Sequence, residues 1–520
     1  MRWPDLVVAL SLSNLVYLRC WAEMLTLDRN GYYWLTNPPS PPHFIALIVN
    51  IILMALILTG LMSGLRQRHG LAVKLAPLFG LLILVSLVNS LRTLIGRPGN
   101  SLFLRFVVQR TPAFGVLIAI AIVIALAVGG MRALKPVYFL LTLLSPFVAI
   151  AFAQAGYRIA TFDPSITADG RLAARLPAKP PNAPRVVWVI FDEWDDGLAF
   201  KDRSPRIHLP ETDRLRNGSL FASEAITANT NTDWSMPSLT TGMPVQDVHP
   251  YGPSEMMLRP PGSGQWLRWS RQPNVFGKAR ELGFNTAVVA WAIPYCRVLN
   301  SDLTDCWWWS GSTQHNSNGN TVPEILINQP RSLFETIYRS PFGQSLSTQR
   351  HRMIHEAVLA KSLQVACDRS FGLILLHLPI PHPPYFYNAA TGKDDLGATP
   401  IFGILKQTQQ GYLDALELAD KTLGSLRHAM EMAGVWDTAT VVLSSDHPFR
   451  HHDTLDGKPT SLTVPYLIKA AGQTQPQKYD AAFSALLTSK LILAFLSGEL
   501  ARAEQVPAWL DAHRSEYPIR

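Results

Sequence analysis

The sequence predicts an α/β protein in two parts, a bundle of membrane helices followed by a domain built on a mostly parallel sheet. Of its 520 residues, 48% are hydrophobic and only 16% are charged, which is too apolar for an ordinary soluble protein. Nearly all of the apolar excess lies before about residue 156. The remainder has the mixed composition of a globular domain and is long enough to bury a substantial core.

The first part contains five apolar stretches that approach the roughly 20 residues needed for a helix to cross a bilayer. They are residues 5–22, 44–65, 76–95, 113–131 and 137–155. The first stretch ends in Arg19, Cys20 and Glu23 and has no small-residue cleavage site, so we interpret it as a retained anchor and not a signal peptide. We therefore expect a transmembrane domain of five helices over residues 1–157.

Basic residues in the loops predict the orientation of these helices. Two loops, after the second and after the fourth span, carry Arg66, Arg68, Lys74, Arg132 and Lys135. Positively charged loops tend to stay in the cytoplasm, so five crossings place everything after Tyr157 on the other side. The loop between the third and fourth spans also carries arginines, which disagrees with this topology unless SLFLRFVVQR lies in the interface.

The net charge of +8 and the pI near 9.3 do not indicate a nucleic-acid-binding protein. Lys and Arg are scattered along the chain, and many of them flank apolar runs. We expect no nucleic-acid partner and interpret the charge as membrane-proximal.

Four cysteines are too few for a disulfide scaffold, and none belongs to a CxxC pair. Cys296 and Cys306 bracket a short loop and are candidates for one disulfide if the domain faces an oxidising compartment. Two free thiols remain the alternative, because sequence separation does not fix the geometry of a bridge.

Residues 158–184 contain LPAKPPNAP, which predicts a semi-rigid extended linker. A second domain then spans residues 185–520, where short apolar runs alternate with helical patterns, as a parallel sheet covered on both faces requires. The predicted strands are RVVWVIF, TAVVAWA, FGLILLHL, TATVVLSS and TVPYLIKA. The clearest helix lies within residues 404–432, with an apolar stripe of Leu416, Ala419, Leu423, Leu426 and Met430 and with Gly434 at its end.

Functional groups of a parallel sheet collect at the carboxyl ends of its strands, so the polar residues that end each run are the first candidates. The first run leads into Asp192 and Glu193. A later run delivers His377, with His382 close behind, and another delivers Asp446 and His447. Alone, each has a structural explanation as a helix cap or a loop histidine. Together they supply the carboxylates and imidazoles that a divalent metal requires.

A hydroxyl-rich stretch, ANTNTDWSMPSLTTG, follows the first strand and contains nucleophile candidates. Thr and Ser attack only when a base or a metal favours the alkoxide, so a hydroxyl beside a metal centre makes chemical sense. The alternative is a capped helix start with Pro237 early in the helix. Both can hold, because a helix N-terminus favours an attacking oxygen and a transferred phosphate.

Four segments of residues 185–470 resemble the alkaline phosphatase and sulfatase superfamily. They are VVWVIFDEW, PETDRLRNGSLF, the stretch from YLDALELADKTLGSL to VVLSSDH, and TSLTVPYLI. The SSDH element behind such a helix is the most specific of them. The resemblance implies an alkaline phosphatase-like α/β/α sandwich.

Type I sulfatases of this superfamily use Cys or Ser followed by x-Pro-x-Arg and oxidise that residue to formylglycine. Ser235-Met236-Pro237 is similar to the start of this motif, but Leu239 stands where the Arg is required. Lipid A phosphoethanolamine transferases have a Thr followed by x-x-Ser-Val-Pro, which Thr232 to Pro237 resembles. Lipoteichoic acid synthases also combine five membrane helices with an external domain and a Thr nucleophile. The resemblance implies that Thr232 is the nucleophile.

The resemblance also implies a divalent metal, with zinc first and manganese, magnesium or calcium as alternatives. Its implied ligands are Asp192 or Glu193 together with Thr232, Asp446 and His447. His382 is implied to assist proton transfer and to contact the substrate or a second metal, and His377 to contact the substrate. After SSDH the usual Gly-Glu is replaced by Pro448-Phe449-Arg450. Arg450 and Lys458 are anion contacts or solvated surface residues, and His451, His452 or neither supplies a later histidine.

The function implied is a two-step transfer of a phosphoethanolamine or phosphoglycerol head group through a Thr intermediate. The donor would be a membrane phospholipid and the acceptor an envelope glycan or glycolipid, at a bacterial inner membrane with the catalytic domain in the periplasm. One alternative is a sulfatase-like hydrolase of sulfate or phosphate esters. Another is a catalytically inactive membrane protein.

Overall fold

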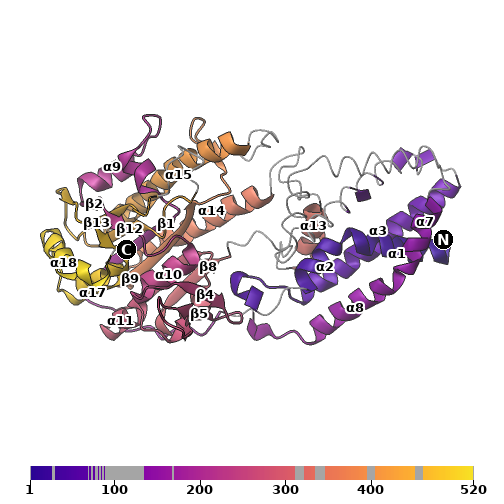
Figure 1. The fold of residues 1–520 in the computed structure, drawn as a ribbon, viewed down its shortest axis with the longest axis horizontal. Helices are drawn as coiled ribbons and strands as arrows, with labels where there is room; N and C mark the ends of the chain where they lie inside the picture. Colours follow the sequence, from indigo (N-terminus) through magenta and orange to yellow (C-terminus); the bar gives the residue numbers. More distant parts are fainter. Residues whose placement is uncertain are drawn as a thin grey trace. The chain divides into compact units, whose positions relative to one another are not determined.

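The computed structural model describes residues 2–25, 30–67, 134–166, 169–310, 321–333, 346–394, 404–450 and 461–518, with a few isolated positions between 70 and 87. It divides into two compact units, whose elements are labelled in Figure 1. The helical unit comprises Met1–Asp28, Asn37–Ser165 and Gln314–Gly343. The α/β unit comprises Arg29–Thr36, Ile166–Thr313 and Gln344–Arg520. Each unit therefore contains a short segment from the sequence range of the other.

Two described helices of the helical unit are long and apolar enough to cross a membrane, Pro41–Arg66 (α3) and Lys135–Ala160. The second contains α7 (Leu134–Leu143) and α8 (Ser145–Ala160). The expected first span is broken at Tyr17 into α1 (Trp3–Val16) and α2 (Leu18–Leu25), which are bent by 58° and make a third span if they act as one. The expected third and fourth spans lie wholly or largely outside the described residues.

Buried polar side chains in the helical unit bind one another. The Trp21 indole donates to Asn14 Oδ1 at 2.8 Å. Asn50 of α3 donates to Gln329 Oε1 at 3.0 Å, and this glutamine belongs to α13 (Val322–Ser332). The helix α13 therefore packs on α3 although it lies far away in the sequence.

The α/β unit is built on an eight-stranded sheet of order β14-β2-β13-β12-β1-β9-β7-β8. Neighbours from β12 to β8 are all parallel, whereas β13 is antiparallel to both of its neighbours. The strands are β1 (Val186–Asp192), β2 (Leu220–Ala222), β7 (Thr286–Trp291), β8 (Asp305–Trp309), β9 (Leu373–Pro381), β12 (Thr440–Ser445), β13 (Tyr466–Lys469) and β14 (Gln477–Tyr479). The five predicted strands are thus confirmed as β1, β7, β9, β12 and β13.

The strand β8 was not predicted, because its sequence DCWWW lies in what reads as a loop between two cysteines. Cys296, in the one-turn helix α12 (Tyr295–Val298), forms a disulfide with Cys306 of β8. This bond joins the segment after β7 to the edge strand that pairs with β7.

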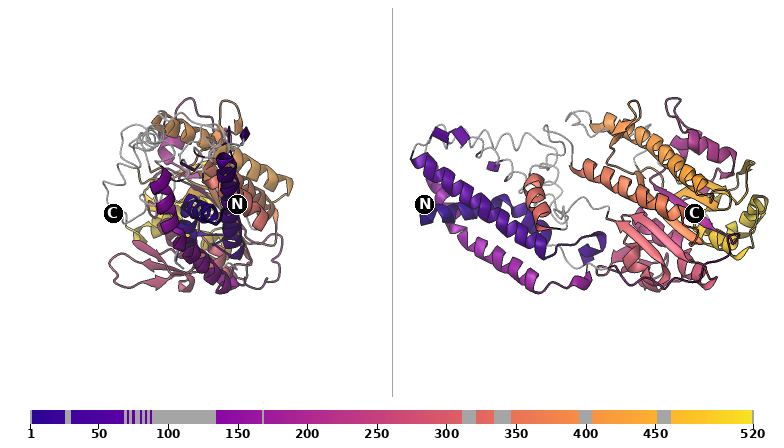
Figure 2. Two further views of the ribbon diagram at one scale, coloured as in Figure 1. Left: turned by 90° about the vertical axis from the view of Figure 1, so that its right-hand side faces the viewer. Right: turned by 180° about the vertical axis from the view of Figure 1, so that it is seen from behind.

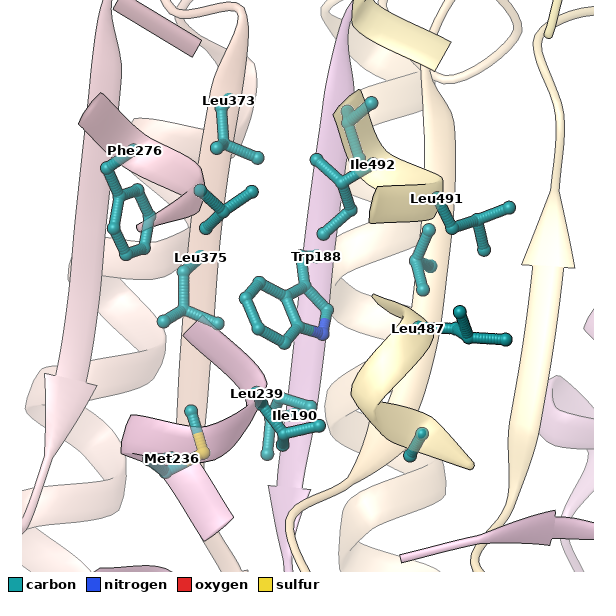
Figure 3. Close-up of a cluster of buried hydrophobic side chains, with 14 of the residues drawn as sticks. Trp188, Ile190, Met236, Leu239, Phe276, Leu373, Leu375, Leu487, Leu491 and Ile492 are labelled. Carbon is teal, nitrogen blue, oxygen red and sulfur yellow. The ribbon is translucent and has the colours of Figure 1, made fainter. Parts of the chain in front are cut away.

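Helices cover both faces of the sheet, as Figures 1 and 2 show. Alternate residues of β1 serve the two faces, because successive side chains of a strand point in opposite directions. One face packs against α10 (Thr232–Thr241), α11 (Val275–Glu281) and α17 (Thr488–Ser497), around Trp188 and Leu375 (Figure 3). The other face packs against α14 (Leu346–Cys367) and α15 (Ile404–Met432). The fold is therefore the predicted α/β/α sandwich.

The helix α15 confirms its predicted apolar stripe, since all five stripe residues are buried in the core. It ends before Gly434, whose φ of 64° is the left-handed conformation that glycine adopts without a steric penalty.

The predicted linker differs from its description in two ways. Residues 158–160 are still helical, because α8 continues to Ala160. Pro164 follows shortly after the end of this helix. Residues 169–184 form no helix or strand, as predicted, but they are bound to the α/β unit. Ala173 N donates to Leu303 O at 2.9 Å, and Leu176 N donates to Asn285 Oδ1 at 2.8 Å. The segment is therefore fixed at the surface and is not a free spacer.

The segment Arg29–Thr36, which precedes α3 in the sequence, is held in the α/β unit by the buried Arg297. The Arg297 guanidinium donates to the carbonyl oxygens of Tyr32, Leu35 and Thr36 at 3.3, 2.8 and 2.9 Å. Tyr33 is completely buried in the core of this unit. Nothing in the sequence NGYYWLT predicted this position.

Candidate active site

Three buried side chains converge at the carboxyl ends of the central parallel strands. Asp192 ends β1, His377 lies in β9 beside Ile190, and Asp446 follows β12 directly. One ligand atom from each lies within 4.8 Å of the others, and in the described part of the chain this is the group able to hold a metal ion. The neighbouring strands bring together residues that are more than 50 positions apart in the sequence.

The hydroxyl of Thr232 faces this group. Thr232 is the first residue of α10, and its Oγ1 donates to Asp446 Oδ2 at 2.7 Å. The same oxygen lies 3.2 Å from His447 Nε2 and 3.5 Å from Asp192 Oδ2. The N-terminus of a ten-residue helix carries partial positive charge, which favours an anionic oxygen at this position. Pro237 lies inside this helix and not in its first turn.

The orientation of His447 leaves its Nε2 atom available toward Thr232. Its Nδ1 lies 2.9 Å from the carbonyl oxygen of Pro448, which can only accept, so Nδ1 carries the proton in the neutral ring. Nε2 lies 3.4 Å from Asp446 Oδ2 and 3.7 Å from Asp192 Oδ1. It is placed to accept a proton from Thr232 or to bind a metal.

Glu193 is placed differently from its neighbour Asp192. Its φ of 63° is unusual for a residue other than glycine and turns the side chain away from the three-residue group. The carboxylate pairs with Arg450 Nε at 2.5 Å, while the backbone N–H donates to Asp446 Oδ1 at 3.1 Å. Glu193 thus orients Asp446 through its backbone and Arg450 through its side chain.

The charges of the group are mutually unfavourable without a cation. Burial, then repulsion from Asp446 and Glu193, raises the pKa of Asp192 well above its ordinary value. Burial also tends to raise the pKa of Asp446, but His447, His377 and the Thr232 hydroxyl outweigh it and lower that pKa. Burial lowers the pKa of His377 to about 4, which keeps its ring neutral.

The donor set fits a divalent metal. Asp192 Oδ1 and His377 Nε2 are buried atoms without a hydrogen-bond partner among the described residues. Unpaired buried polar atoms are unfavourable, and a cation would satisfy both and offset the carboxylate repulsion. Oxygen and imidazole nitrogen ligands suit zinc and manganese in particular.

His382 lies apart from the three-residue group, on the side of Glu193 and Arg450. Its Nδ1 contacts the carbonyl oxygen of Pro383 at 2.6 Å, and its Nε2 accepts from Arg450 Nη2 at 3.2 Å. The Trp291 ring packs edge-on against it with centroids 5.0 Å apart. Arg450 and His382 therefore form one cluster, whereas Lys458, His451 and His452 lie outside the described residues.

Two residues of the site were missed from the sequence. Tyr295 OH lies 3.3 Å from His377 Nδ1 and orients that ring from behind, and no sequence signal pointed to it. Trp291 ends β7, so the rule that strands deliver functional groups at their carboxyl ends would have found it.

Comparisons with known proteins assign most of the α/β unit to a family. Residues 184–492 match the family model described as Sulfatase. No curated protein matches the chain.

Three solved structures are similar to this chain. Ps i-CgsB in complex with k-i-k-neocarrahexaose has 16% identity and a TM-score of 0.44, covering 63% of this chain and 76% of that one. The phosphonate monoester hydrolase of Agrobacterium radiobacter has 13% identity and a TM-score of 0.41, covering 60% and 74%. The PsFucS1 sulfatase from Pseudoalteromonas sp. has 16% identity and a TM-score of 0.40, covering 61% and 69%.

Since the family model matches more than half of the chain, the protein belongs to the sulfatase family and is an enzyme of the alkaline phosphatase and sulfatase superfamily.

Proposed function

We propose that this enzyme transfers a phospho-head group, phosphoethanolamine or phosphoglycerol, from a membrane phospholipid to an envelope glycan or glycolipid. The observation that carries the proposal is the position of Thr232 Oγ1, 2.7 Å from Asp446 Oδ2 and 3.2 Å from His447 Nε2. A hydroxyl held between a carboxylate and an imidazole nitrogen is placed to attack phosphorus.

The residue type also favours direct attack by the hydroxyl. Formylglycine is an aldehyde, which forms by oxidation of the primary alcohol of Ser or of the thiol-bearing carbon of Cys. Oxidation of the secondary alcohol of Thr232 would give a ketone instead. Thr232 therefore does not fit the conventional sulfatase cycle. A covalent phosphothreonine released by a second nucleophile fits it instead.

In the first step, Thr232 Oγ1 attacks the phosphodiester phosphorus and His447 Nε2 accepts its proton. The bond from phosphorus to the diacylglycerol oxygen breaks, and the proton that His447 accepted is passed on to that oxygen. A divalent cation bound by Asp192, His377 and Asp446 would stabilise the negative charge that develops on the phosphoryl oxygens.

In the second step, an acceptor hydroxyl attacks the phosphothreonine, and a site histidine takes its proton. The bond from phosphorus to Thr232 Oγ1 breaks, and this oxygen recovers a proton. The N-terminus of α10 and the Arg450 guanidinium supply positive charge on the two sides of the transferred group. Glu193 holds Arg450 in place for this role.

Lipid use and location belong to the same proposal. Membrane helices in the same chain would bring the phospholipid donor to the site. We propose a multi-pass protein of a bacterial inner membrane with the α/β unit in the periplasm, where glycan and glycolipid acceptors occur. The disulfide between Cys296 and Cys306 suits an oxidising compartment.

Mass spectrometry of the peptide that contains Thr232 tests the transfer. The full-length protein is incubated with phospholipids and a divalent metal but without an acceptor. We expect an adduct on Thr232 whose mass identifies the head group, and no adduct in Thr232→Ala.

The second candidate is a hydrolase of sulfate or phosphate esters, in which water replaces the acceptor. Membership of the sulfatase family favours it. Absence of an adduct together with hydrolysis of a chromogenic sulfate or phosphate diester would support this candidate over the transferase.

A further inference from the structure

A small antiparallel sheet of the α/β unit presents one face to the outside. It consists of β4 (Asp247–Pro250), β5 (Met256–Arg259) and β6 (Leu267–Arg268). Met256 and Leu258 are completely buried and point into the core. Directly opposed residues share a face, so His249, Met257 and Arg268 form one row of the outer face, and Asp247 lies there opposite Arg259.

This outer face combines exposed aromatic rings with arginines. Tyr251 is 58% exposed and Trp266 is 40% exposed. The Arg259 guanidinium lies 5.1 Å from the centroid of the Trp266 ring, and that of Arg268 lies 5.9 Å from the centroid of the Tyr251 ring. Arg259 is paired with Asp247 at 2.6 Å, whereas Arg268 makes no ion pair with the part of the chain that is described. The face therefore carries an excess positive charge.

The turn that bears Tyr251 is bound to the segment Arg29–Thr36. Gly252 N donates to Asn30 Oδ1 at 2.8 Å, and Tyr33 OH contacts Met256 Sδ at 3.8 Å. Both contacts lie within the α/β unit. The position of the turn is therefore tied to that of Asn30.

The segment that holds this turn is joined to the candidate membrane helices by short stretches of chain. Asn30 is five residues after Leu25, the last residue of α2, and Thr36 is five residues before Pro41, the first residue of the candidate span α3. Five extended residues reach at most about 17 Å. Because both connections are short, the turn is a candidate for contact with a membrane that these helices cross.

We propose that the face formed by Tyr251, Trp266, Arg259 and Arg268 lies in the lipid headgroup layer and binds anionic phospholipid headgroups. Tyr and Trp prefer this layer because each has an apolar body and a polar end. The arginines supply donors and charge for headgroup phosphates. The contact would orient the α/β unit at the membrane. This proposal depends on the candidate membrane helices and is independent of the chemistry of Thr232.

Photo-crosslinking tests the contact. The photoreactive amino acid p-benzoylphenylalanine replaces Tyr251 or Trp266 in the full-length protein, which is reconstituted in nanodiscs and irradiated. Mass spectrometry should find lipid adducts at both positions. The control replaces Met432, which is 77% exposed at the end of α15, and should give no lipid adduct. Absence of lipid adducts at both test positions, or adducts only with protein or glycan, would overturn the proposal.

The headgroup charge is tested with the same probe at Trp266. We expect the adduct yield to be about three-fold higher with phosphatidylglycerol than with phosphatidylcholine nanodiscs. Arg268→Gln should remove this preference while leaving the melting temperature unchanged. Equal yields in both lipids without this substitution would contradict binding of anionic headgroups.

Discussion

The central strands of the α/β unit differ sharply between their two ends. Toward their amino ends, β1 and β9 bury Trp188, Leu373 and Leu375 among apolar neighbours (Figure 3). At their carboxyl ends, Asp192 and Asp446 are equally buried but face each other and the unpaired Nε2 of His377. One end provides stability and the other holds groups that are unfavourable until a cation binds. Substitutions at the two ends should therefore affect different measurements.

The largest expected effect is on turnover at the polar end. Thr232→Ala should lower kcat/KM by about 10⁴-fold or more, because it removes the attacking oxygen. The melting temperature and the metal content should stay as in the wild type. Thr232→Ser keeps a hydroxyl and should retain measurable activity with the same substrate. An alanine variant within ten-fold of the wild type would assign the nucleophile elsewhere.

Asp192→Asn should separate metal binding from stability. We expect metal affinity and turnover to fall by about 10²-fold or more, because a buried ligand and its charge are lost. The metal-free variant should melt no lower than the wild type, since the amide relieves repulsion from Asp446 and Glu193. Metal content by mass spectrometry and melting curves with and without metal measure both effects. The matched control is Glu193→Gln, which should keep more metal because Glu193 faces Arg450.

The apolar end should respond in the opposite way. Leu375→Ala removes a completely buried side chain and should lower the free energy of unfolding by about 3 kcal/mol. Its kcat at a temperature well below the melting point should match that of the wild type. A large loss of kcat in the folded variant would show that the two ends are not independent.

The smallest effect concerns pH. Burial raises the pKa of Asp233, the residue after Thr232, to about 6 from an ordinary value of 3.8. The stability that this group contributes is therefore full below pH 3.8 and is lost as the pH rises through 6. The Asp233→Asn variant has no carboxyl to ionise at this position. Its metal-free form should therefore gain about 2 kcal/mol of stability relative to the wild type between pH 4 and pH 7. Melting temperatures measured across this range check it, and a difference that is constant with pH would contradict it.

Sequence reasoning succeeded where the signal is local. The strands β1, β7, β9 and β12 are continuous apolar runs, and SSDH places Asp446 and His447 at a strand end without any knowledge of distant contacts. The strand β8 escaped prediction because its pairing with β7 is not visible in DCWWW.

The finer assignments at the site depend on geometry that no motif contains. Whether Asp192 or Glu193 faces the cation is decided by the left-handed backbone of Glu193. His377 was expected to contact substrate, but the structure places it with Asp192 and Asp446, because β1 and β9 are adjacent strands. Tyr295 reaches His377 only through the packing of α12.

The buried Arg297 has a consequence for how the enzyme is kept in place. Its guanidinium donates to three carbonyl oxygens of a segment that continues on both sides into the helical unit, and the chain passes between the two units five times. A single protease cut within residues 169–184 gives two fragments that no covalent bond joins. Each fragment still carries a segment bound to the other, since the first carries residues 30–36, which Arg297 binds, and the second carries α13, which binds α3. These non-covalent contacts should keep the two fragments together after a single cut. A fragment that begins at residue 166 lacks residues 30–36 and leaves the buried Arg297 without these three acceptors, so it should be less stable than the whole chain.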